Sequence, residues 1–272
     1  MLIIAATPIG NLGDASTRLV EHLSTVEHIA AEDTRSLTKL AGLLGVKLKA
    51  KLYSLHEHNE LERADQIVAI ALESDVLLVS DAGMPTVSDP GFALVRAAVA
   101  AGVEVTVVPG PSAVLAALAV SGLATDRFTF EGFAPRKDAE RKSVFEALAG
   151  ETRTMVFFES PHRIADTLAA AAQVFGADRQ ATVSRELTKK FEHTERGTLA
   201  ELIEWAKTDP KGEMVFVIAG AVKTNKDVSA LVADVLKLEA SGLRMKDAVA
   251  EIAELNAVSK SVLYQLSLDA KK

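Results

Sequence analysis

The chain has 272 residues, 49% of them hydrophobic and 25% charged, a composition typical of a soluble globular protein and not of a disordered one. It contains no cysteine, which excludes disulfide frameworks, thiolate metal sites and cysteine nucleophiles and fits a reducing compartment. A net charge of −7 argues against a protein that coats DNA or RNA by bulk attraction, so a polyanionic partner must meet a local patch. Residues 1–10 lack the basic region of a signal peptide, and no run reaches the roughly 20 apolar residues of a membrane span. We therefore expect a cytoplasmic protein with neither DNA nor a membrane as partner.

Short apolar runs alternate with helical patterns in the first half of the chain. The runs occupy residues 2–6, 28–32, 51–55, 76–80 and 103–108. They are apolar at nearly every position, which is typical of strands covered on both faces. The pattern predicts a largely parallel sheet with crossover helices, hence an α/β domain over residues 1–112.

A second series of strand-like runs follows the very apolar stretch at 113–123. These runs lie at 128–133, 154–160, 181–187 and 213–220, with helical patterns between them. They predict a second α/β domain over residues 113–221. Three short amphipathic patterns then begin near Asp or Ser residues that can cap a helix, which predicts a small helical domain over 227–272.

Ligands of open α/β sheets bind at the carboxyl ends of the strands, so the turns that follow the strands are the candidate sites. The first turn, Thr7 to Asp14, has neither the dinucleotide fingerprint nor a phosphate-binding loop. In the segment from Ser80 to Gly91, an Asp followed by small residues suits a ribose, an amino group or a sulfonium. The pair Asp89 and Pro90 is instead predicted to be the N-cap and first residue of a helix.

Charged clusters follow three other predicted strands. Glu32, Asp33 and Arg35 form the first, and His56 and Asn59 belong to the second. Such groups can orient a hydroxyl or accept its proton. His56 and His58 lack a spaced third ligand, so we expect no metal site, and we expect Glu57 and Glu60 to be solvated residues of a helix start. In the third cluster, Ser160 and Pro161 predict an N-cap and a first helical residue, next to Glu159, His162 and Arg163.

Two segments of the second half are locally basic. Residues 127–142 and 179–196 each carry a net charge of +2, whereas residues 1–120 carry −6. Such segments can supply the phosphate contacts that an acidic protein needs for RNA. The residues proposed for these contacts are Arg136, Lys137, Arg141, Arg185 and Lys189.

Eight segments in one order carry a resemblance to a known family. They are ATPIGNLGDAS, IAAEDTR, LHEHNE, VSDAGMPTVSDPG, VPGPSA, FEGFAPRK, FFESPHR and SRELTKKFEHTERGT. Together they closely resemble the 16S ribosomal RNA cytidine 2′-O-methyltransferases of the tetrapyrrole methylase superfamily, from residue 2 to about 220, and the terminal SKSVLYQL is similar to that family's small C-terminal domain. The resemblance implies two α/β domains that bind S-adenosylmethionine in the cleft between them, a homodimer, and methylation of a cytidine ribose in the decoding region of the small ribosomal subunit.

The resemblance also implies positions for the methyl donor. The donor would lie against three loops, represented by Pro8, by Asp81, Ala82 and Gly83, and by Ser112 and Ala113. The loop around Phe133 and the strand at 213–220 would close over it, although this strand ends in VFVIAGA where an acidic residue is expected near Ala219. Activation of the ribose hydroxyl is assigned, as a hypothesis, to Glu32, Asp33, Arg35 and His56, with Glu159 and Arg163 facing them.

Two other functions remain open at this point. One is a methyltransferase that acts on a ring carbon of a tetrapyrrole, since the fold and the methyl donor would be shared. The other is a non-catalytic ribosome-binding module that keeps the cleft. The HEHNE and FFESPHR segments and the basic stretches favour the RNA enzyme over the first, and the intact DAGMP and GPSA segments argue against the second.

Overall fold

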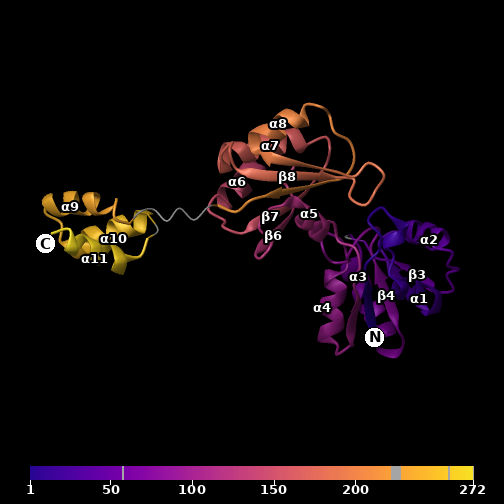
Figure 1. Cartoon of the computed structure of the whole chain (residues 1–272). Coiled ribbons are helices and arrows are strands. Elements are labelled where there is room, and N and C mark those ends of the chain that lie inside the picture. Colours follow the sequence, from indigo (N-terminus) through magenta and orange to yellow (C-terminus); the bar gives the residue numbers. More distant parts are fainter. Residues whose placement is uncertain (57, 222–227, 257, 272) are drawn as a thin grey trace. The chain divides into compact units, whose positions relative to one another are not determined.

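The chain forms two compact units, Met1–Ala221 and Val222–Lys272. The computed structural model describes residues 1–56, 58–221, 228–256 and 258–271. The larger unit contains two five-stranded sheets with their helices, and the smaller unit is helical (Figure 1). The predicted class, two α/β layers followed by a helical region, is confirmed. Glu57 and the predicted start of the helical domain at 227 lie outside the described residues.

The first sheet is parallel throughout. Its order is β3-β2-β4-β1-β5. The strands are β1 (Leu2–Ala5), β2 (His28–Ala31), β3 (Lys51–Ser54), β4 (Val76–Val79) and β5 (Val105–Val108). The crossover helices are α1 (Thr17–Thr25), α2 (Thr34–Leu43), α3 (Glu60–Glu73) and α4 (Phe92–Ala100). Every strand therefore ends at the same edge of the sheet, where its loop can meet the others.

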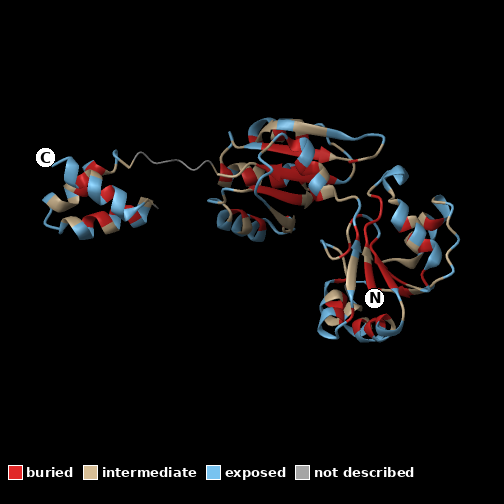
Figure 2. Ribbon diagram, turned by 60° about the horizontal axis from the view of Figure 1, so that its bottom comes forward, coloured by how far each residue is buried: buried red, intermediate tan, exposed pale blue. Residues whose placement is uncertain are grey.

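Both faces of this sheet are buried, which explains the continuous apolar runs. Leu2 and Val76 pack with Ile67 of α3 in one core, and Ile3 and Leu77 pack with helix α1 in a second core on the opposite face. Buried residues accordingly dominate its strands in Figure 2. Helices on both faces of the central strands β2, β4 and β1 leave no solvated side there that would require polar residues at alternate positions.

The second sheet is mixed. Its order is β6-β7-β10-β8-β9, and among the described strands only β6 and β7 run parallel. The strands are β6 (Phe128–Phe133), β7 (Thr154–Glu159), β8 (Gln180–Arg185), β9 (His193–Thr198) and β10 (Met214–Ile218). The polar sequence of β9 gave no strand signal, because this strand lies at the sheet edge with no residue fully buried.

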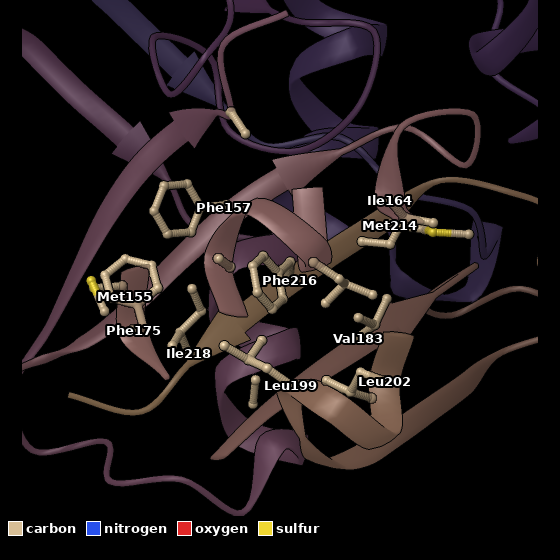
Figure 3. Packing of buried hydrophobic residues seen from close by; sticks show 14 of the residues in the cluster. Met155, Phe157, Ile164, Phe175, Val183, Leu199, Leu202, Met214, Phe216 and Ile218 are labelled. Atoms are coloured by element: carbon tan, nitrogen blue, oxygen red, sulfur yellow. The ribbon is translucent and has the colours of Figure 1, made fainter. Parts of the chain in front are cut away.

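The core of the second sheet lies under three helices, α6 (Asp138–Ala147), α7 (Ile164–Phe175) and α8 (Leu199–Ala206). Figure 3 shows Phe216 of β10 next to Leu199 of α8, with Phe157 of the neighbouring strand β7 in the same core. Helix α5 (Ala113–Ser121) packs on the opposite face, where its residues Val114 and Leu118 form a separate core. The first residues of α5 thereby lie where the loop after β5 meets the second sheet.

The smaller unit has three helices among its described residues, α9 (Val232–Ala240), α10 (Met245–Asn256) and α11 (Lys260–Asp269). Val235, Val249 and Leu263, one from each helix, share a core of their own. Ser259 caps α11 by accepting a hydrogen bond from the Val262 backbone, as its position in the sequence predicts. In the described parts of the chain, no helix has the length and apolar character needed to cross a membrane.

Candidate active site

The loops after β1 and β4 are joined by a two-residue bridge. The Thr7 backbone N–H donates to the Gly83 carbonyl at 2.9 Å, and the Gly83 N–H donates to the Thr7 carbonyl at 3.1 Å. The buried Thr7 hydroxyl also donates to the Ser80 carbonyl at 3.2 Å. Gly83 has a φ of +84°, a conformation that disfavours any side chain. The two loops, with Pro8 in one and Gly83 in the other, therefore form one rigid surface, the floor of the site.

An apolar cavity of about 210 Å³ lies between this floor and the second sheet. Its walls are Ile9, Ala82, Ala113, Phe133, Phe158, Glu159, Leu187, Glu213, Met214 and Val215. A smaller cavity of about 60 Å³ shares Ile9, Ala82, Ala113 and Phe158 with it and adds residues that include Gly83, Ser112 and Asp89. Five of the seven residues expected to hold the methyl donor line these two cavities: Ala82, Gly83, Ser112, Ala113 and Phe133.

The direction of β10 decides which of its ends faces the cavity. Because β10 is antiparallel to β7, Met214 pairs with Glu159 at the end of β7. Ala219 lies at the opposite end, where its N–H donates to the Gln180 carbonyl at 2.9 Å. Glu213, Met214 and Val215 therefore line the cavity, and the missing acidic residue near Ala219 has no bearing on it.

A larger polar cavity of about 690 Å³ adjoins the apolar one. It is lined by Glu32, His56, His58, Glu60, Thr86, Ser88, Asp89, Pro90 and Phe133. Phe133, which is 58% exposed, belongs to the walls of both the polar and the larger apolar cavity. Of the predicted catalytic residues, Glu32 and His56 line the polar cavity. Within the described residues, no group of three His, Asp or Glu side chains is arranged to hold a metal ion.

Two carboxylates fix the loops after β2 and β4 to each other. The Asp81 backbone N–H donates to Glu32 Oε2 at 3.2 Å, and the Asp33 N–H donates to Asp81 Oδ1 at 3.2 Å. Each carboxylate thus accepts from the other loop. Glu32, which lines the polar cavity described above, and Asp81, which lines none of the three cavities, are thereby held in place beside each other, as side chains that bind a ligand need to be.

Asp33 is the N-cap of α2. Its carboxylate accepts from the Arg35 N–H at 2.8 Å and pairs with the Arg35 guanidinium at 2.6 Å. These bonds lower the pKa of Asp33 to about 2, which makes it a poor proton acceptor at neutral pH. The Arg35 side chain is 90% exposed. The geometry gives Asp33 a capping role, and its low pKa argues against the proton-transfer role expected for it.

Glu159 and Arg163 form an internal ion pair. The Glu159 side chain is fully buried, accepts from the Thr167 hydroxyl at 2.6 Å and pairs with Arg163. Arg163 also donates to the Ala134 carbonyl at 3.1 Å, which ties down the loop that carries Phe133. Glu159 lines the apolar cavity, but neither residue lines the polar one, so the pair does not face Glu32 as expected. The predicted helix start at Ser160 and Pro161 is wrong, because α7 has Arg163 as its N-cap.

Asp89 is a titratable cavity residue that sequence reasoning missed. The pair Asp89 and Pro90 was predicted to start a helix, but the N-cap of α4 is Gly91. Asp89 instead lines the polar cavity and the 60 Å³ cavity. Burial raises its pKa to about 6, with further contributions from the negative charges of Glu32 and Asp81, against a hydrogen bond from Ser80. An Asp before a Pro fits a helix cap equally well, so the sequence held no signal that separates the two roles.

The five basic residues proposed for RNA contacts have different environments. Arg136 and Lys137 are exposed, and Lys137 pairs with Glu140 at 2.8 Å. Arg141 is only 3% exposed and bonds to Asp138 and, at 3.4 Å, to the Pro135 carbonyl. Its burial contradicts the expectation that it contacts phosphate; it fastens the loop after β6 to α6.

Arg185 and Lys189 lie at the other basic segment. Arg185 is half-buried and donates to the Lys211 carbonyl at 3.4 Å. The Lys189 ammonium lies 3.0 Å from Glu186 and 2.6 Å from Glu213, so its charge is matched within the chain. Its stem lies over Gly10, where a Cβ would approach Lys189 Cγ to 2.4 Å. Lys189 therefore packs against the loop after β1, and its ammonium is already paired with two carboxylates of the chain. This environment favours a structural role over contact with phosphate.

The chain is similar in sequence to known methyltransferases. Residues 1–203 match the family model described as tetrapyrrole (corrin/porphyrin) methylases. A protein of Mycobacterium tuberculosis (strain CDC 1551 / Oshkosh) named ribosomal RNA small subunit methyltransferase I is 45% identical over 273 residues, which cover 100% of this chain and 95% of the relative. The protein of the same name from Haemophilus influenzae is 44% identical, with 98% of this chain and 96% of the relative covered.

Two solved structures have a similar fold. The methyltransferase CobJ matches with a TM-score of 0.59 and 19% identity, over 81% of this chain and 94% of its own. A diphthine synthase matches with a TM-score of 0.60 and 17% identity, over 80% of this chain and 89% of its own.

Proposed function

Because the chain belongs to the tetrapyrrole methylase family and is a methyltransferase, we propose that it methylates 16S ribosomal RNA in the small ribosomal subunit, at the 2′-oxygen of a cytidine in the decoding region, with S-adenosylmethionine as methyl donor. The observation that carries the proposal is 45% identity, over the whole length, to a relative named as a small-subunit ribosomal RNA methyltransferase. The two adjoining cavities support it, since the reaction needs separate places for a donor and an acceptor.

The residues around the apolar cavity fit the methyl donor. Ala82, Gly83 and Ala113 are small, so the donor can approach the backbone of the loops after β4 and β5. The carboxylate of Asp81, which directly precedes Ala82 and lies beside Glu32, can accept hydrogen bonds from the hydroxyls of a ribose. When bound, S-adenosylmethionine supplies an electrophilic methyl carbon on its sulfonium. The chain supplies the walls that orient it and exclude water.

The polar cavity fits the acceptor nucleotide. RNA sites are read through unstacked bases that stack on aromatic side chains, and an extruded cytidine needs a pocket deep enough to hold it. Phe133, the last residue of β6, presents an exposed ring at the cavity wall, and the exposed Arg136 lies three residues further along the chain. Glu32 and His56 are then placed near the sugar.

The proposal retains the homodimer that the resemblance implies. β5 is an edge strand, and its Val107 is 46% exposed. Leu115 on α5 is 57% exposed. Apolar side chains of this kind can be covered by a second copy of the chain. Sedimentation equilibrium measures the mass of the particle; a monomer at micromolar concentration contradicts this part of the proposal.

One labelling experiment tests the proposed reaction. The protein is incubated with methyl-labelled S-adenosylmethionine and, in separate reactions, with small ribosomal subunits, protein-free 16S RNA and a uroporphyrinogen-type substrate. We expect label in the RNA of the subunits and much less in the protein-free RNA, because an acidic enzyme with few phosphate contacts needs a preformed site. Label in the tetrapyrrole indicates the alternative methyltransferase. Binding to subunits without label indicates a non-catalytic module.

A further inference from the structure

We propose that Asp89 is the general base that accepts the proton of the acceptor hydroxyl, an inference that rests on the proposed O-methylation. Asp89 lies beside Ala82, Gly83 and Ser112 in the 60 Å³ cavity, on the side of the methyl donor. It also lies in the polar cavity with Glu32 and His56, on the side of the acceptor. Among the described residues that line these cavities, it is the titratable one shared between the two sides.

The backbone holds Asp89 there at some conformational cost. Thr86 and Ser88, which precede it, have φ values of +76° and +61°, which are unfavourable for residues with a side chain, and above all for a β-branched one. Non-glycine residues in this region persist where the surrounding structure fixes them, often at functional sites. Two bonds fix this loop: Thr86 N–H donates to the Pro90 carbonyl at 3.3 Å, and Gly91 N–H donates to Glu60 Oε2 at 2.6 Å.

Gly91 allows this path of the chain. It has a φ of +120°, and a Cβ there would lie 2.9 Å from Leu78 Cδ2. The loop thus passes directly over β4 before α4 begins. Glu60, expected to be a solvated residue at the start of α3, is instead the acceptor that fixes this turn and so positions Asp89.

The surroundings of Asp89 suit a proton acceptor near neutral pH. Partial burial and the charges of Glu32 and Asp81 raise the pKa of Asp89 to about 6. His56, His58 and Glu60 line the same cavity, and the Ser80 hydroxyl is its hydrogen-bonding neighbour. A carboxylate of this kind is still ionised at pH 7.5 but binds a proton more strongly than an ordinary Asp. The other acidic groups are less suited: Asp81 and Glu32 accept backbone N–H groups, and Asp33 is paired with Arg35.

Methyl transfer to the 2′-oxygen is coupled to transfer of its proton to Asp89. The 2′-oxygen forms a bond to the methyl carbon while the carbon–sulfur bond breaks and its electron pair stays on sulfur. The proton of the 2′-hydroxyl passes to a carboxylate oxygen of Asp89. The products are a ribose methyl ether, a neutral thioether and the carboxylic acid form of Asp89, which then loses its proton to water.

The test compares full-length wild type with Asp89→Asn and with the control Asp65→Asn, a change of the same charge on the exposed face of α3. Single-turnover methylation of small subunits is measured from pH 5 to 8.5. We expect Asp89→Asn to be slower by a factor of about 100 or more at pH 7.5, the usual contribution of a general base. We also expect the wild-type rate to fall below pH 6 and this acidic limb to be absent from the residual Asp89→Asn activity.

Thermal unfolding and calorimetric titration with S-adenosylmethionine establish whether Asp89→Asn is folded and keeps its donor site. A variant that passes both and methylates within threefold of wild type, or that keeps the acidic limb, overturns the inference. Nucleoside analysis of the wild-type product distinguishes failure of the inference about Asp89 from failure of the proposed function. A methyl group on a nucleobase in place of the ribose contradicts the proposed function. In that case no general base for a ribose hydroxyl is needed.

Discussion

Two aspartates that follow strands of the same sheet have opposite electrostatic environments. Asp33 accepts from Arg35, which lowers its pKa to about 2, whereas burial raises the pKa of Asp89 to about 6. A lowered carboxyl pKa contributes stability above the ordinary value of 3.8, and this contribution is lost as the pH falls toward 2. A raised carboxyl pKa has the reverse effect: the ionised form, populated above pH 6, destabilises the folded state. The ionised carboxylate of Asp33 therefore stabilises the folded state, whereas that of Asp89 destabilises it.

The first prediction concerns the stability of Asp89→Asn. Because Asn is uncharged, the variant avoids the cost of an ionised carboxylate, and we expect it to melt at a higher temperature than wild type at pH 8. The difference must shrink as the pH falls through about 6, since wild-type Asp89 then becomes neutral as well. Melting curves followed by circular dichroism at several pH values measure this. An equal gain at pH 8 and pH 5 contradicts the electrostatic explanation.

The second prediction separates a structural from a catalytic role for Glu159. Its side chain is fully buried among Thr167, Ser160 and Arg163, so Glu159→Ala leaves the Arg163 cation without its partner. We expect a loss of about 3 kcal/mol in the free energy of unfolding, as is usual when one partner of a buried ion pair is removed. Urea denaturation measures it. Unchanged stability combined with lost methylation restores the catalytic role that the sequence suggested.

The sequence does not reveal in which direction the strands of the second sheet run. The apolar runs located four strands of the second sheet, but an apolar run has the same pattern in a parallel and an antiparallel pair when both faces are covered. The resemblance led us to expect the end of the strand at 213–220 near the methyl donor, and the antiparallel pairing places its beginning there. The loops after the first sheet were located correctly, because crossover helices make all five strands parallel.

The third prediction uses the first turn of α5. Ala113 lines both apolar cavities, so Ala113→Phe fills space that the methyl donor needs. We expect the dissociation constant of S-adenosylmethionine to rise at least tenfold, measured by calorimetry. Ala119→Phe is the matched control, because Ala119 belongs to the same helix and is exposed. Equal loss of affinity in the two variants, or none in either, contradicts the assignment of this cavity to the donor.

At the scale of the whole molecule, the two compact units have separate cores. In the described parts of the chain, the buried residues of the core of the helical unit lie between 232 and 263, and the four cores of the larger unit contain none of them. The sequence predicted this helical region from its periodicity and capping residues, although the boundary between the first two predicted domains stays a prediction. Residues of both sheets line the apolar cavity. The sequence therefore does not mark a sharp boundary between the first and the second predicted domain.

The fourth prediction follows from the separate cores. A chain that ends at Ala221 keeps every residue of the four cores of the larger unit, so we expect it to fold and to bind S-adenosylmethionine with the affinity of the full chain. Its main thermal transition should lie within a few degrees of that of the full chain. Aggregation or a loss of donor binding shows that the larger unit depends on the helical one.

The most direct test of the proposed activity is the identity of the methylated nucleoside. Small ribosomal subunits that lack the modification are incubated with the protein and S-adenosylmethionine, and their 16S RNA is digested and examined by mass spectrometry. We expect 2′-O-methylcytidine from a single position in the decoding region. A methyl group on a base, a different nucleoside, or no modification of the RNA contradicts it.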